Sequence, residues 1–355
     1  MDQLNVAVIG YGLAGAVFHA PLIAAEPRLR VAAIVTGPAE RGAQARAEHP
    51  DARILPAAED LFGAGGESID LVVIAAPNDA HAPLARASLA AGFPVVVDKP
   101  VTPTAAEARE LIGLAEQAGL LLSVFQNRRW DGDFLTARKL IEEGELGEVT
   151  RFESRFERWR PVPKGGWRET GGREQAAGLL FDLGSHLVDQ ALTLFGSVVS
   201  VYAQLDARRP SVGSDDDAFV ALTHADGVRS HLWMSSVAAQ SGPRLRVLGS
   251  RGAYVKYGLD VQEAALREGG RPGGAGQGSE DWGVENSDAW GTCGTDAESR
   301  TVETERGAYQ AYYAGIAAAL LDGGPVPVDP HDAVAALDVL EAARRSADEN
   351  VVVLL

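Results

Sequence analysis

The chain has 355 residues, 46% of them hydrophobic, which is enough for two domains that each bury a core. Its formal net charge of -17 at pH 7 argues against nucleic acid and anionic membranes as partners, because both would repel it. The single cysteine, Cys293, excludes a disulfide within the chain and a cysteine-based metal site. The first residues enter a strand pattern without a basic leader, and no apolar run is long enough to span a bilayer. We therefore expect a soluble cytoplasmic protein.

Short β-branched apolar runs alternate with helical patterns over about the first 122 residues. This alternation is typical of a parallel sheet that helices cover on both faces. We therefore predict a doubly wound α/β dinucleotide-binding domain over residues 1–123. The expected elements are, in chain order, NVAVIG (5–10), AVFHAPLIAAE (16–26), RVAAIVT (30–36), DLVVIAAP (70–77), HAPLARASLAAG (81–92), PVVVDKP (94–100), TAAEARELIGLAEQAG (104–119) and LLLSVF (120–125).

From about residue 135 the pattern changes to successive strands separated by turns. We predict an α+β domain over residues 124–355, with a large, mostly antiparallel, open-faced sheet. Because the outer face of such a sheet needs a cover, we expect a homodimer or homotetramer. The expected elements are 134–144 (helix), 148–160, 178–192 (helix), 198–209, 217–227, 228–238 and 244–258, followed by two closing helices over 308–323 and 331–349.

Residues 268–300 are rich in glycine and polar side chains and show no clear period. We expect a long surface loop here, and a mobile linker or a lid is the functional alternative.

Three glycines directly follow the first predicted strand and open the first helix. Gly10 permits a tight turn, Gly12 lets the backbone approach a pyrophosphate, and Gly15 allows close packing of helix and strand. The position at the start of a βα repeat favours a nicotinamide dinucleotide over a glycine-rich turn without a ligand. The residues expected to contact the cofactor in this turn are Gly10, Tyr11, Gly12, Leu13, Ala14 and Gly15.

The end of the second predicted strand indicates which dinucleotide binds. A carboxylate at this point would bind the ribose hydroxyls of NAD, but the strand ends at Thr36 without an acid. A hydroxyl at Thr36 and a guanidinium at Arg41 could bind a phosphate instead. We predict NADP as the cofactor, with NAD as the alternative because Glu40 lies next to Arg41.

Ligands of open parallel sheets lie at the carboxyl ends of the strands. Two expected strands finish in IAAPNDAH (74–81) and VVVDKP (95–100), which brings Lys99 near the nicotinamide. A plain turn with an exposed lysine is the alternative for Lys99, and capping a helix is the alternative for His81. The further residues expected at the cofactor are Ala76, Pro77, Asn78, His81, Asp98, Lys99, Pro100 and Asn127.

The segment GLLFDLGSHLVDQAL (178–192) predicts an apolar helix with three titratable groups on one face. Asp182, His186 and Asp189 are spaced by four and three residues, so their side chains would point to one place. A polar stripe that faces solvent is the alternative. Asp189 is expected to be a structural partner, and Gly184 indicates close approach of another backbone or of the substrate, because glycine costs about 1 kcal/mol inside a helix.

These motifs, in this order, resemble the glucose-fructose oxidoreductase / inositol dehydrogenase / rhizopine catabolism (Gfo/Idh/MocA) family of NAD(P)-dependent oxidoreductases. The resemblance covers nearly the whole chain and includes PNDAHAPLARASLAAGFPVVVDKP and DLGSHLVD. The stretches IGYGLAGAVFHAPLI, FQNRRWDGDFLTARKLI and LLFDLGSHLVDQALTLFG look most similar to the NADP-dependent scyllo-inositol dehydrogenases. Asp98 departs from the glutamate that the family more often has, which puts its contact with the cofactor ribose in doubt.

The resemblance implies that Lys99, Asp182 and His186 are the catalytic set. This agrees with the chemistry, because oxidation of a secondary alcohol needs a base near neutrality, for which His186 is suited. A cation such as Lys99 would stabilise the developing alkoxide. Asp182 would orient the imidazole or bind a substrate hydroxyl.

The predicted substrate is a small polyol or sugar, with Arg128, Arg129, Trp159 and Trp167 as candidate contacts. Hydride transfer needs no metal, and no histidine-carboxylate spacing indicates a metal site. Another sugar or a trans-dihydrodiol is an alternative substrate, and a non-catalytic NAD(P)-binding regulator is the alternative of another class. The remaining histidines are expected to be ordinary, namely His19, His49, His224, His231 and His331.

Overall fold

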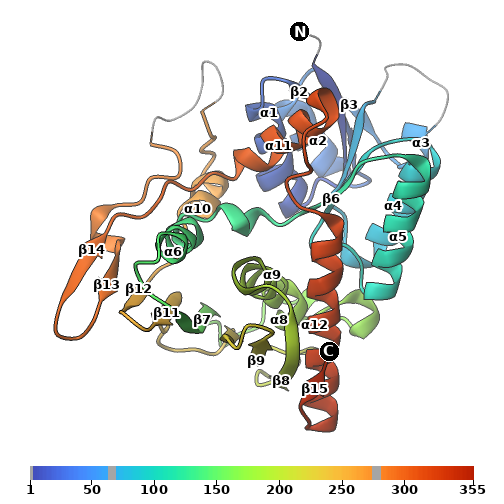
Figure 1. Ribbon diagram of the computed structural model, residues 1–355. Helices are drawn as coiled ribbons and strands as arrows, with labels where there is room; N and C mark the ends of the chain where they lie inside the picture. The colour runs from blue at the N-terminus through green and yellow to red at the C-terminus, as the bar shows by residue number, and fades with distance from the viewer. Residues whose placement is uncertain (1–2, 63–68, 274–280) are drawn as a thin grey trace.

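Two β-sheets organise the chain, which the computed structural model describes over residues 3–62, 69–273 and 281–355. A six-stranded sheet lies in one half of the molecule and a nine-stranded sheet in the other (Figure 1). The predicted combination of a doubly wound parallel sheet with a second, mostly antiparallel sheet is confirmed. Among the described residues, no helix is both long and apolar enough to cross a membrane.

The first sheet is entirely parallel, with the strand order β3-β2-β1-β4-β5-β6. This is the order of a dinucleotide-binding Rossmann domain, in which ligands lie where the strand order reverses, between β1 and β4. Its central strands are buried on both faces, which explains their nearly continuous apolar sequence, rich in valine and isoleucine. The strands are β1 (Leu4–Ile9), β2 (Leu29–Val35), β3 (Arg53–Leu55), β4 (Leu71–Ile74), β5 (Val95–Asp98) and β6 (Leu122–Phe125).

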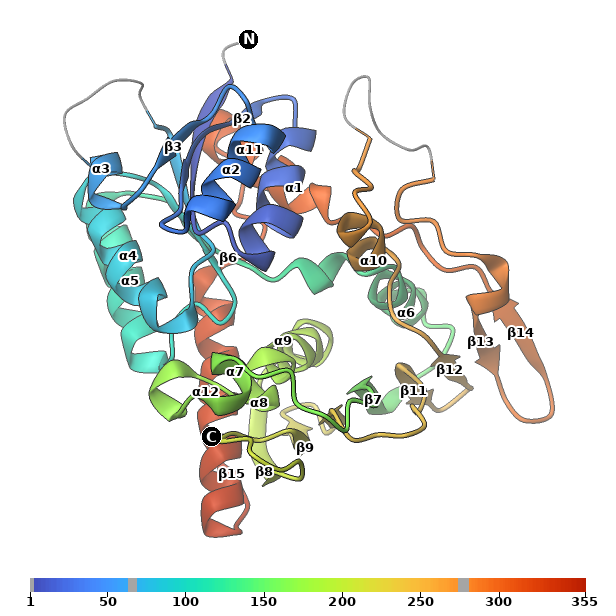
Figure 2. The same ribbon diagram turned by 180° about the vertical axis from the view of Figure 1, so that it is seen from behind.

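Helices cover both faces of this sheet, with η1, α1 and α2 on one side and α4 and α5 on the other (Figures 1 and 2). The first helix starts with a π-helical segment, η1, which the sequence predicts as an ordinary helix. The helices are η1 (Ala14–His19), α1 (Ala20–Ala25), α2 (Ala39–Glu48), α3 (Glu59–Phe62), α4 (Asn78–Ala90) and α5 (Ala105–Ala118).

The second sheet has the strand order β14-β13-β12-β11-β7-β10-β9-β8-β15, and only β7 and β10 pair in parallel. Its strands alternate buried and half-exposed residues, as expected when one face packs on helices. The strands are β7 (Val149–Glu157), β8 (Val198–Asp206), β9 (Asp217–His224), β10 (Arg229–Ser235), β11 (Leu245–Gly249), β12 (Ala253–Lys256), β13 (Gly291–Gly294), β14 (Ser299–Val302) and β15 (Val353–Leu354).

The helices of the second half pack on the inner face of this sheet and against the first domain. Helix α12 contacts α5 of the first domain as well as α9 and β8 of the second, so it joins the two halves (Figure 1). The helices are η2 (Asn127–Trp130), α6 (Gly132–Glu142), α7 (Trp167–Thr170), η3 (Arg173–Gln175), α8 (Leu179–Asp182), α9 (Gly184–Phe195), α10 (Gln262–Arg267), η4 (Ser287–Ala289), α11 (Gln310–Asp322) and α12 (Pro330–Glu349).

The expectation of a long surface loop over 268–300 is wrong for its last part. Strand β13 and the start of β14 lie there, and Trp282 is buried with its indole nitrogen donating to Gln310, 3.0 Å away. These strands consist largely of glycine and polar residues, so they show no apolar pattern in the sequence. They pair at the edge of the sheet through main-chain hydrogen bonds. Residues 274–280 of the expected loop lie outside the described residues.

Candidate active site

The turn between β1 and η1 holds the three glycines of the predicted dinucleotide motif. Gly10 has a φ of +100°, and a side-chain carbon there would collide with the carbonyl oxygen of Ala75. A side-chain carbon on Gly15 would collide with the carbonyl oxygen of Gly10. At Gly12 the nearest atom would be a guanidinium nitrogen of Arg41, 3.7 Å away. Tight packing at two glycines and an open backbone at Gly12 fit a turn that receives a pyrophosphate.

The side chains around this turn differ in exposure. Tyr11 is buried, and its hydroxyl lies 2.6 Å from Glu48, so only its backbone faces the turn. The cofactor contact of Tyr11 therefore stays a prediction for its backbone. Thr36 is buried at the end of β2, while Arg41 is exposed in the first turn of α2 beside Gly12. This arrangement places a guanidinium next to the proposed phosphate-binding backbone.

Lys99 follows directly after β5, whose three valines are fully buried and fix the end of the strand. Its Nζ lies 3.1 Å from Oδ1 of Asp182 and 2.5 Å from the Asp182 carbonyl oxygen. An ammonium from the first domain thus meets a carboxylate from the second. The Lys99 backbone N–H donates to Asp98 Oδ1, 2.8 Å away, and the same oxygen lies 3.8 Å from Nε2 of the buried His19.

Asp182 is held by two cations. Arg168 Nε lies 3.4 Å from the same carboxylate oxygen that Lys99 contacts. Burial by itself raises the pKa of Asp182, but the charges of Lys99 and Arg168 outweigh it and bring the pKa to about 2. Asp182 is therefore a carboxylate throughout the neutral pH range, and it fixes the Lys99 ammonium.

The expected helix over 178–192 is divided at Leu183. Helix α8 ends at Asp182 and α9 starts at Gly184, while Leu183 between them keeps right-handed helical dihedral angles. The Asp182 carboxylate binds Lys99, and the His186 ring contacts Gln126 and not Asp182. The close approach expected at Gly184 comes from side chains, because an added carbon would lie 3.1 Å from Met234.

His186 is buried in the first turn of α9, and its ring faces Gln126 at the end of β6. Nδ1 lies 3.2 Å from Gln126 Oε1. An amide oxygen only accepts, so Nδ1 carries the proton and the lone pair is on Nε2. Burial first, and then the charges of Lys99, Arg128 and Arg244, hold the pKa of His186 well below its ordinary value. The ring is consequently a neutral base at Nε2 at pH 7.

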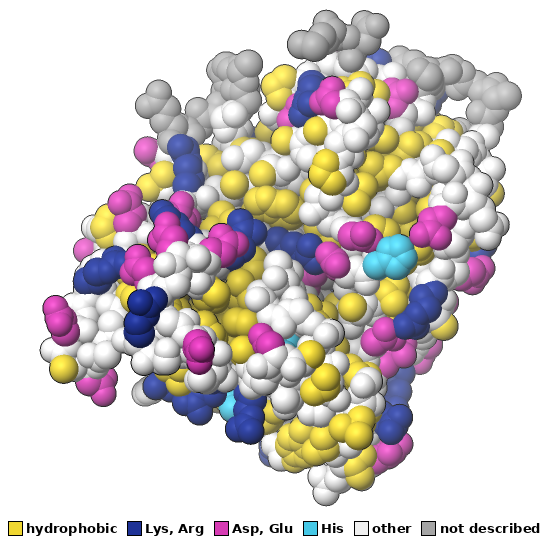
Figure 3. Space-filling model, in the orientation of Figure 1, with side chains coloured by type: hydrophobic (Ala, Val, Ile, Leu, Met, Phe, Trp, Pro, Cys, Tyr) yellow, Lys and Arg dark blue, Asp and Glu magenta, His cyan; other side chains and the backbone are white. Residues whose placement is uncertain are grey.

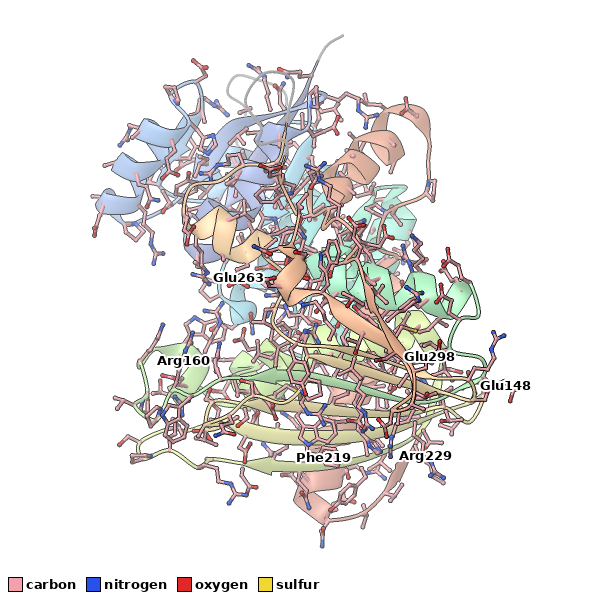
Figure 4. The ribbon with its side chains drawn as sticks, turned by 90° about the vertical axis from the view of Figure 1, so that its left-hand side faces the viewer. Glu148, Arg160, Phe219, Arg229, Glu263 and Glu298 are labelled. Carbon is pink, nitrogen blue, oxygen red and sulfur yellow. The ribbon has the colours of Figure 1, made fainter. Side chains whose placement is uncertain are left out.

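Arg128 belongs to a buried ionic cluster behind His186. Its guanidinium contacts Asp131, the hydroxyl of Tyr309 and, at 2.5 Å, Glu263 of α10, which Figure 4 labels. Arg244 lies in the same cluster, with Nε 3.2 Å from Asp133. Both terminal nitrogens of Arg128 thus bind within the protein, and its substrate contact stays a prediction.

Arg129 also binds within the protein. It forms two hydrogen bonds to Asp189, at 2.8 and 2.7 Å, and an ion pair with Asp332 of α12 at 3.0 Å. Figure 3 shows basic and acidic side chains next to each other where the two domains meet. The prediction that Asp189 is a structural partner is confirmed, and the substrate contact of Arg129 stays a prediction.

His81 does not line the cofactor site with its ring, contrary to the prediction. The side chain is fully buried, and its two ring nitrogens contact the carbonyl oxygens of Pro100 and Ala76. Pro77 precedes α4 as its N-cap residue. Burial has the largest effect on His81 and lowers its pKa, against the opposing effect of Asp98.

The other predicted contacts lie around this centre. The Asn78 amide donates to the carbonyl oxygens of residues 175 and 176, at 3.3 Å each, and so links α4 to the second domain. Asn127 is buried at the start of η2. Trp159 is 56% exposed, and Trp167 stacks under the guanidinium of Arg168 at the start of α7.

A cavity of about 520 Å³ lies elsewhere, between α6 and β14, and none of the predicted site residues lines it.

Two residues of this centre are missing from the sequence prediction. Gln126 lies at the carboxyl end of β6, where the strand-end rule would have indicated it before its neighbour Asn127. Arg168 follows Trp167 in a glycine-rich segment, and no pattern in the sequence places it next to Asp182.

Two family models match the chain in the same order as the two sheets. The Oxidoreductase family, NAD-binding Rossmann fold, matches residues 4–126, and the Oxidoreductase family, C-terminal alpha/beta domain, matches residues 138–355. The chain belongs to the Gfo/Idh/MocA oxidoreductase family. It is an NAD(P)-binding dehydrogenase, so the predicted family and the predicted enzyme class are confirmed.

Similar proteins extend over the full length of the chain. It is 43% identical to the uncharacterized oxidoreductase YdgJ of Escherichia coli, over 100% of this chain and 99% of that protein. It is 34% identical to the scyllo-inositol 2-dehydrogenase (NADP(+)) IolW of Bacillus subtilis, over 100% of this chain and 97% of that protein. The solved structure of the oxidoreductase YvaA from Bacillus subtilis superposes with a TM-score of 0.92 and 34% identity, covering 100% of this chain and 99% of that one.

Proposed function

We propose that this dehydrogenase transfers hydride between a secondary alcohol of a polyol or sugar and NADP, as a scyllo-inositol dehydrogenase-like enzyme. The observation that carries the proposal is the meeting of Lys99 and Asp182 from the two domains, 3.1 Å apart, beside the neutral His186. The identity of 34% with IolW over the full chain favours an inositol as the first substrate to test.

The chemistry assigns a separate task to each of the three side chains. When bound, the nicotinamide ring accepts hydride from the carbinol carbon. Nε2 of His186 takes the hydroxyl proton, since Nδ1 donates to Gln126. The Lys99 ammonium stabilises the negative charge that develops on the alcohol oxygen, and Asp182 keeps this ammonium in place.

A screen of polyols with NADP and NAD, followed by the absorbance of reduced cofactor, tests this function. Its arms are scyllo-inositol, other inositols, free sugars and a trans-dihydrodiol. Turnover of an inositol or sugar with NADP supports the proposal. Turnover of the dihydrodiol alone would keep the hydride chemistry but reject the substrate class.

The preference for NADP is proposed from the residues beside the glycine turn. Arg41 is exposed and close to Gly12, and the tip of β2 ends at Thr36 without a carboxylate. Replacing Arg41 by alanine is expected to lower kcat/KM for NADP about 10- to 100-fold, as a charge-assisted hydrogen bond contributes about 1.5–3 kcal/mol. The value for NAD should stay nearly constant, because NAD lacks the 2′-phosphate.

Arg46→Ala is the matched control for this experiment, since Arg46 is another exposed arginine of α2. It should leave both cofactors unaffected. Equal losses for NADP and NAD in Arg41→Ala, or a preference of the unchanged enzyme for NAD, would contradict the assignment.

We also propose a homodimer or homotetramer in which the outer face of the nine-stranded sheet is covered. On this face the half-exposed rings of Phe219, His231 and Trp233 contact one another, and the Arg155 guanidinium lies 3.9 Å from the Trp233 ring centroid. Figure 4 shows the nine-stranded sheet from its β14 edge, with Phe219 labelled. Light scattering should give at least twice the chain mass, and Trp233→Glu should shift it toward the monomer. A monomer at every concentration would contradict this proposal.

A further inference from the structure

Arg158 carries a guanidinium on the inner face of the nine-stranded sheet, beside the proposed site. It directly follows β7, and its backbone N–H donates to the carbonyl oxygen of Ser235, 2.9 Å away. Side chains alternate between the two faces along a strand. Phe156, two residues earlier, is buried on the inner face under the guanidinium groups of Arg128 and Arg244, so Arg158 continues this inner row.

Within the described part of the chain, no group binds the Arg158 guanidinium. Its Nε is buried without a hydrogen-bond partner, and the side chain forms no ion pair with a described residue. Arg128 and Arg129, by contrast, contact Glu263 and Asp189 at 2.5 and 2.7 Å. Taking a charge out of water without a partner is costly, and buried charges in proteins are normally paired. Arg158 therefore lacks a counter-charge that the fold itself could have supplied.

The acids near Arg158 already have cationic partners. Asp182 and Glu263 are the two acids whose charges act on Arg158 most strongly. Each contacts two other cations, namely Lys99 and Arg168 for Asp182, and Arg128 and Arg267 for Glu263. Neither carboxylate is therefore free to compensate the charge of Arg158.

Further cations lie close to Arg158. Burial first, and then the charge of Arg160, lower the pKa of Arg158, and Arg209 acts in the same direction. Arg209 is compensated by Glu169 and Asp216, at 3.0 and 2.8 Å. The Arg160 side chain, at one end of the sheet in Figure 4, has no ion pair among the residues that the structure describes. Uncompensated positive charge thus gathers beside the proposed site of a chain whose formal net charge is -17.

We propose that Arg158 is a specificity-determining residue that binds an anionic group of the substrate, so that the polyol or sugar carries a carboxylate or a phosphate. The inference rests on the proposed function and narrows its substrate class. A guanidinium presents parallel N–H groups that match the oxygens of a carboxylate or a phosphate. A neutral hydroxyl would accept one of these N–H groups and leave the charge uncompensated.

The position of Arg158 links this anion site to the proposed reaction centre. The charge of Arg158 acts on Asp182 and helps to lower the pKa of this carboxylate, which in turn contacts the Lys99 ammonium. The anionic group at Arg158 and the reacting alcohol near Lys99 can therefore belong to one small molecule.

Substrates that differ only in charge test the inference. D-glucose, D-glucuronate and D-glucose 6-phosphate form one set, the corresponding galactose compounds form a second, and all are assayed with NADP. We expect kcat/KM for one class of anion to exceed that for the neutral hexose at least tenfold, and the better class distinguishes carboxylate from phosphate. Arg158→Gln should raise KM for this anion about 10- to 100-fold and change kcat less than about threefold, since it removes a charge-assisted contact that ground state and transition state share. The kinetics of the neutral hexose should not change.

Arg151→Gln is the matched control for Arg158→Gln. Arg151 is an arginine of the same strand, on its outer face, where it pairs with Glu153 at 3.2 Å. Its KM values should equal those of the unchanged enzyme. Arg158→Lys keeps the charge without the planar fork, so it should recover part of the lost affinity. An unchanged KM for the anion in Arg158→Gln would overturn the inference.

Calorimetric titration of the same compounds into the NADPH complex, which cannot oxidise an alcohol, separates this inference from the proposed function. The anion should bind at least tenfold more tightly than the neutral hexose, and Arg158→Gln should abolish the difference. Binding of the anion without any turnover with NADP would reject the proposed function and keep the inference. Turnover of inositols or hexoses without tighter binding of an anion would keep the proposed function and overturn the inference.

Discussion

Lys99→Ala is expected to lower kcat for polyol oxidation by about 10²- to 10³-fold, the usual effect of removing one group that stabilises a developing oxyanion. The Lys99 ammonium of the first domain contacts Asp182 of the second domain. A water-exposed lysine elsewhere cannot take its place beside the substrate. The Kd for NADPH should change little, since the proposed cofactor contacts of this residue do not include the phosphates. Steady-state rates and a fluorescence titration give the two values.

Lys139→Ala is the matched control for Lys99→Ala. Lys139 is an exposed lysine of α6 that pairs with Glu305, at 2.5 Å, so it also loses an ion pair when replaced. Its kcat should equal that of the unchanged enzyme. Equal rates in Lys99→Ala and Lys139→Ala would refute the role of Lys99.

His186→Asn is expected to lower kcat by about 10²- to 10⁴-fold, the range that general base catalysis contributes. The pH dependence gives a sharper result. Burial and the cations Lys99, Arg128 and Arg244 keep the pKa of His186 well below its ordinary value of 6.5. On acidification His186 therefore stays neutral until the pH is well below 6.5. The kcat/KM for alcohol oxidation should begin to fall only there. In His186→Asn this acid limb should be absent.

The same lowered pKa affects the stability of the fold, with a defined sign. Above pH 6.5 His186 is neutral in both the folded and the unfolded chain, so its titration has no cost. As the pH falls below 6.5, the unfolded chain gains a proton that the folded chain excludes, and the free energy of unfolding decreases.

An acid limb of kcat/KM that starts at or above pH 6.5, or one that persists in His186→Asn, would contradict the assignment of this base.

Much of the fold can be predicted from the sequence, because strands that are buried on both faces of a sheet have nearly continuous apolar sequences. The strands β1, β4 and β5 are mostly apolar and rich in valine and isoleucine, and a pattern search finds them at nearly their true bounds. Helix α2 and strand β3 are not found in this way. Helix α2 buries only Gly42 and Ala45, and β3 has three half-buried residues, so neither shows an apolar period. The expected domain boundary at residue 123 stays a prediction.

The proposed site was predictable where chemistry follows from position along a strand or turn, and not where it depends on contacts between distant segments. Lys99 and the glycine turn were found from their places at strand ends. The partners of Arg128 and Arg129 lie far away in the chain, as Glu263 and Asp332 show, so both arginines look free in the sequence. The break at Leu183 is equally invisible, because the apolar pattern continues through it.

A double-variant cycle of Lys99→Ala and His186→Asn tests the central claim most directly. Lys99 and His186 are proposed to act on the same alcohol oxygen in one step, so their effects on kcat should not be independent. We predict that the double variant is within about tenfold of the slower single variant. Losses that multiply in full, as for two residues without a shared step, would contradict the account.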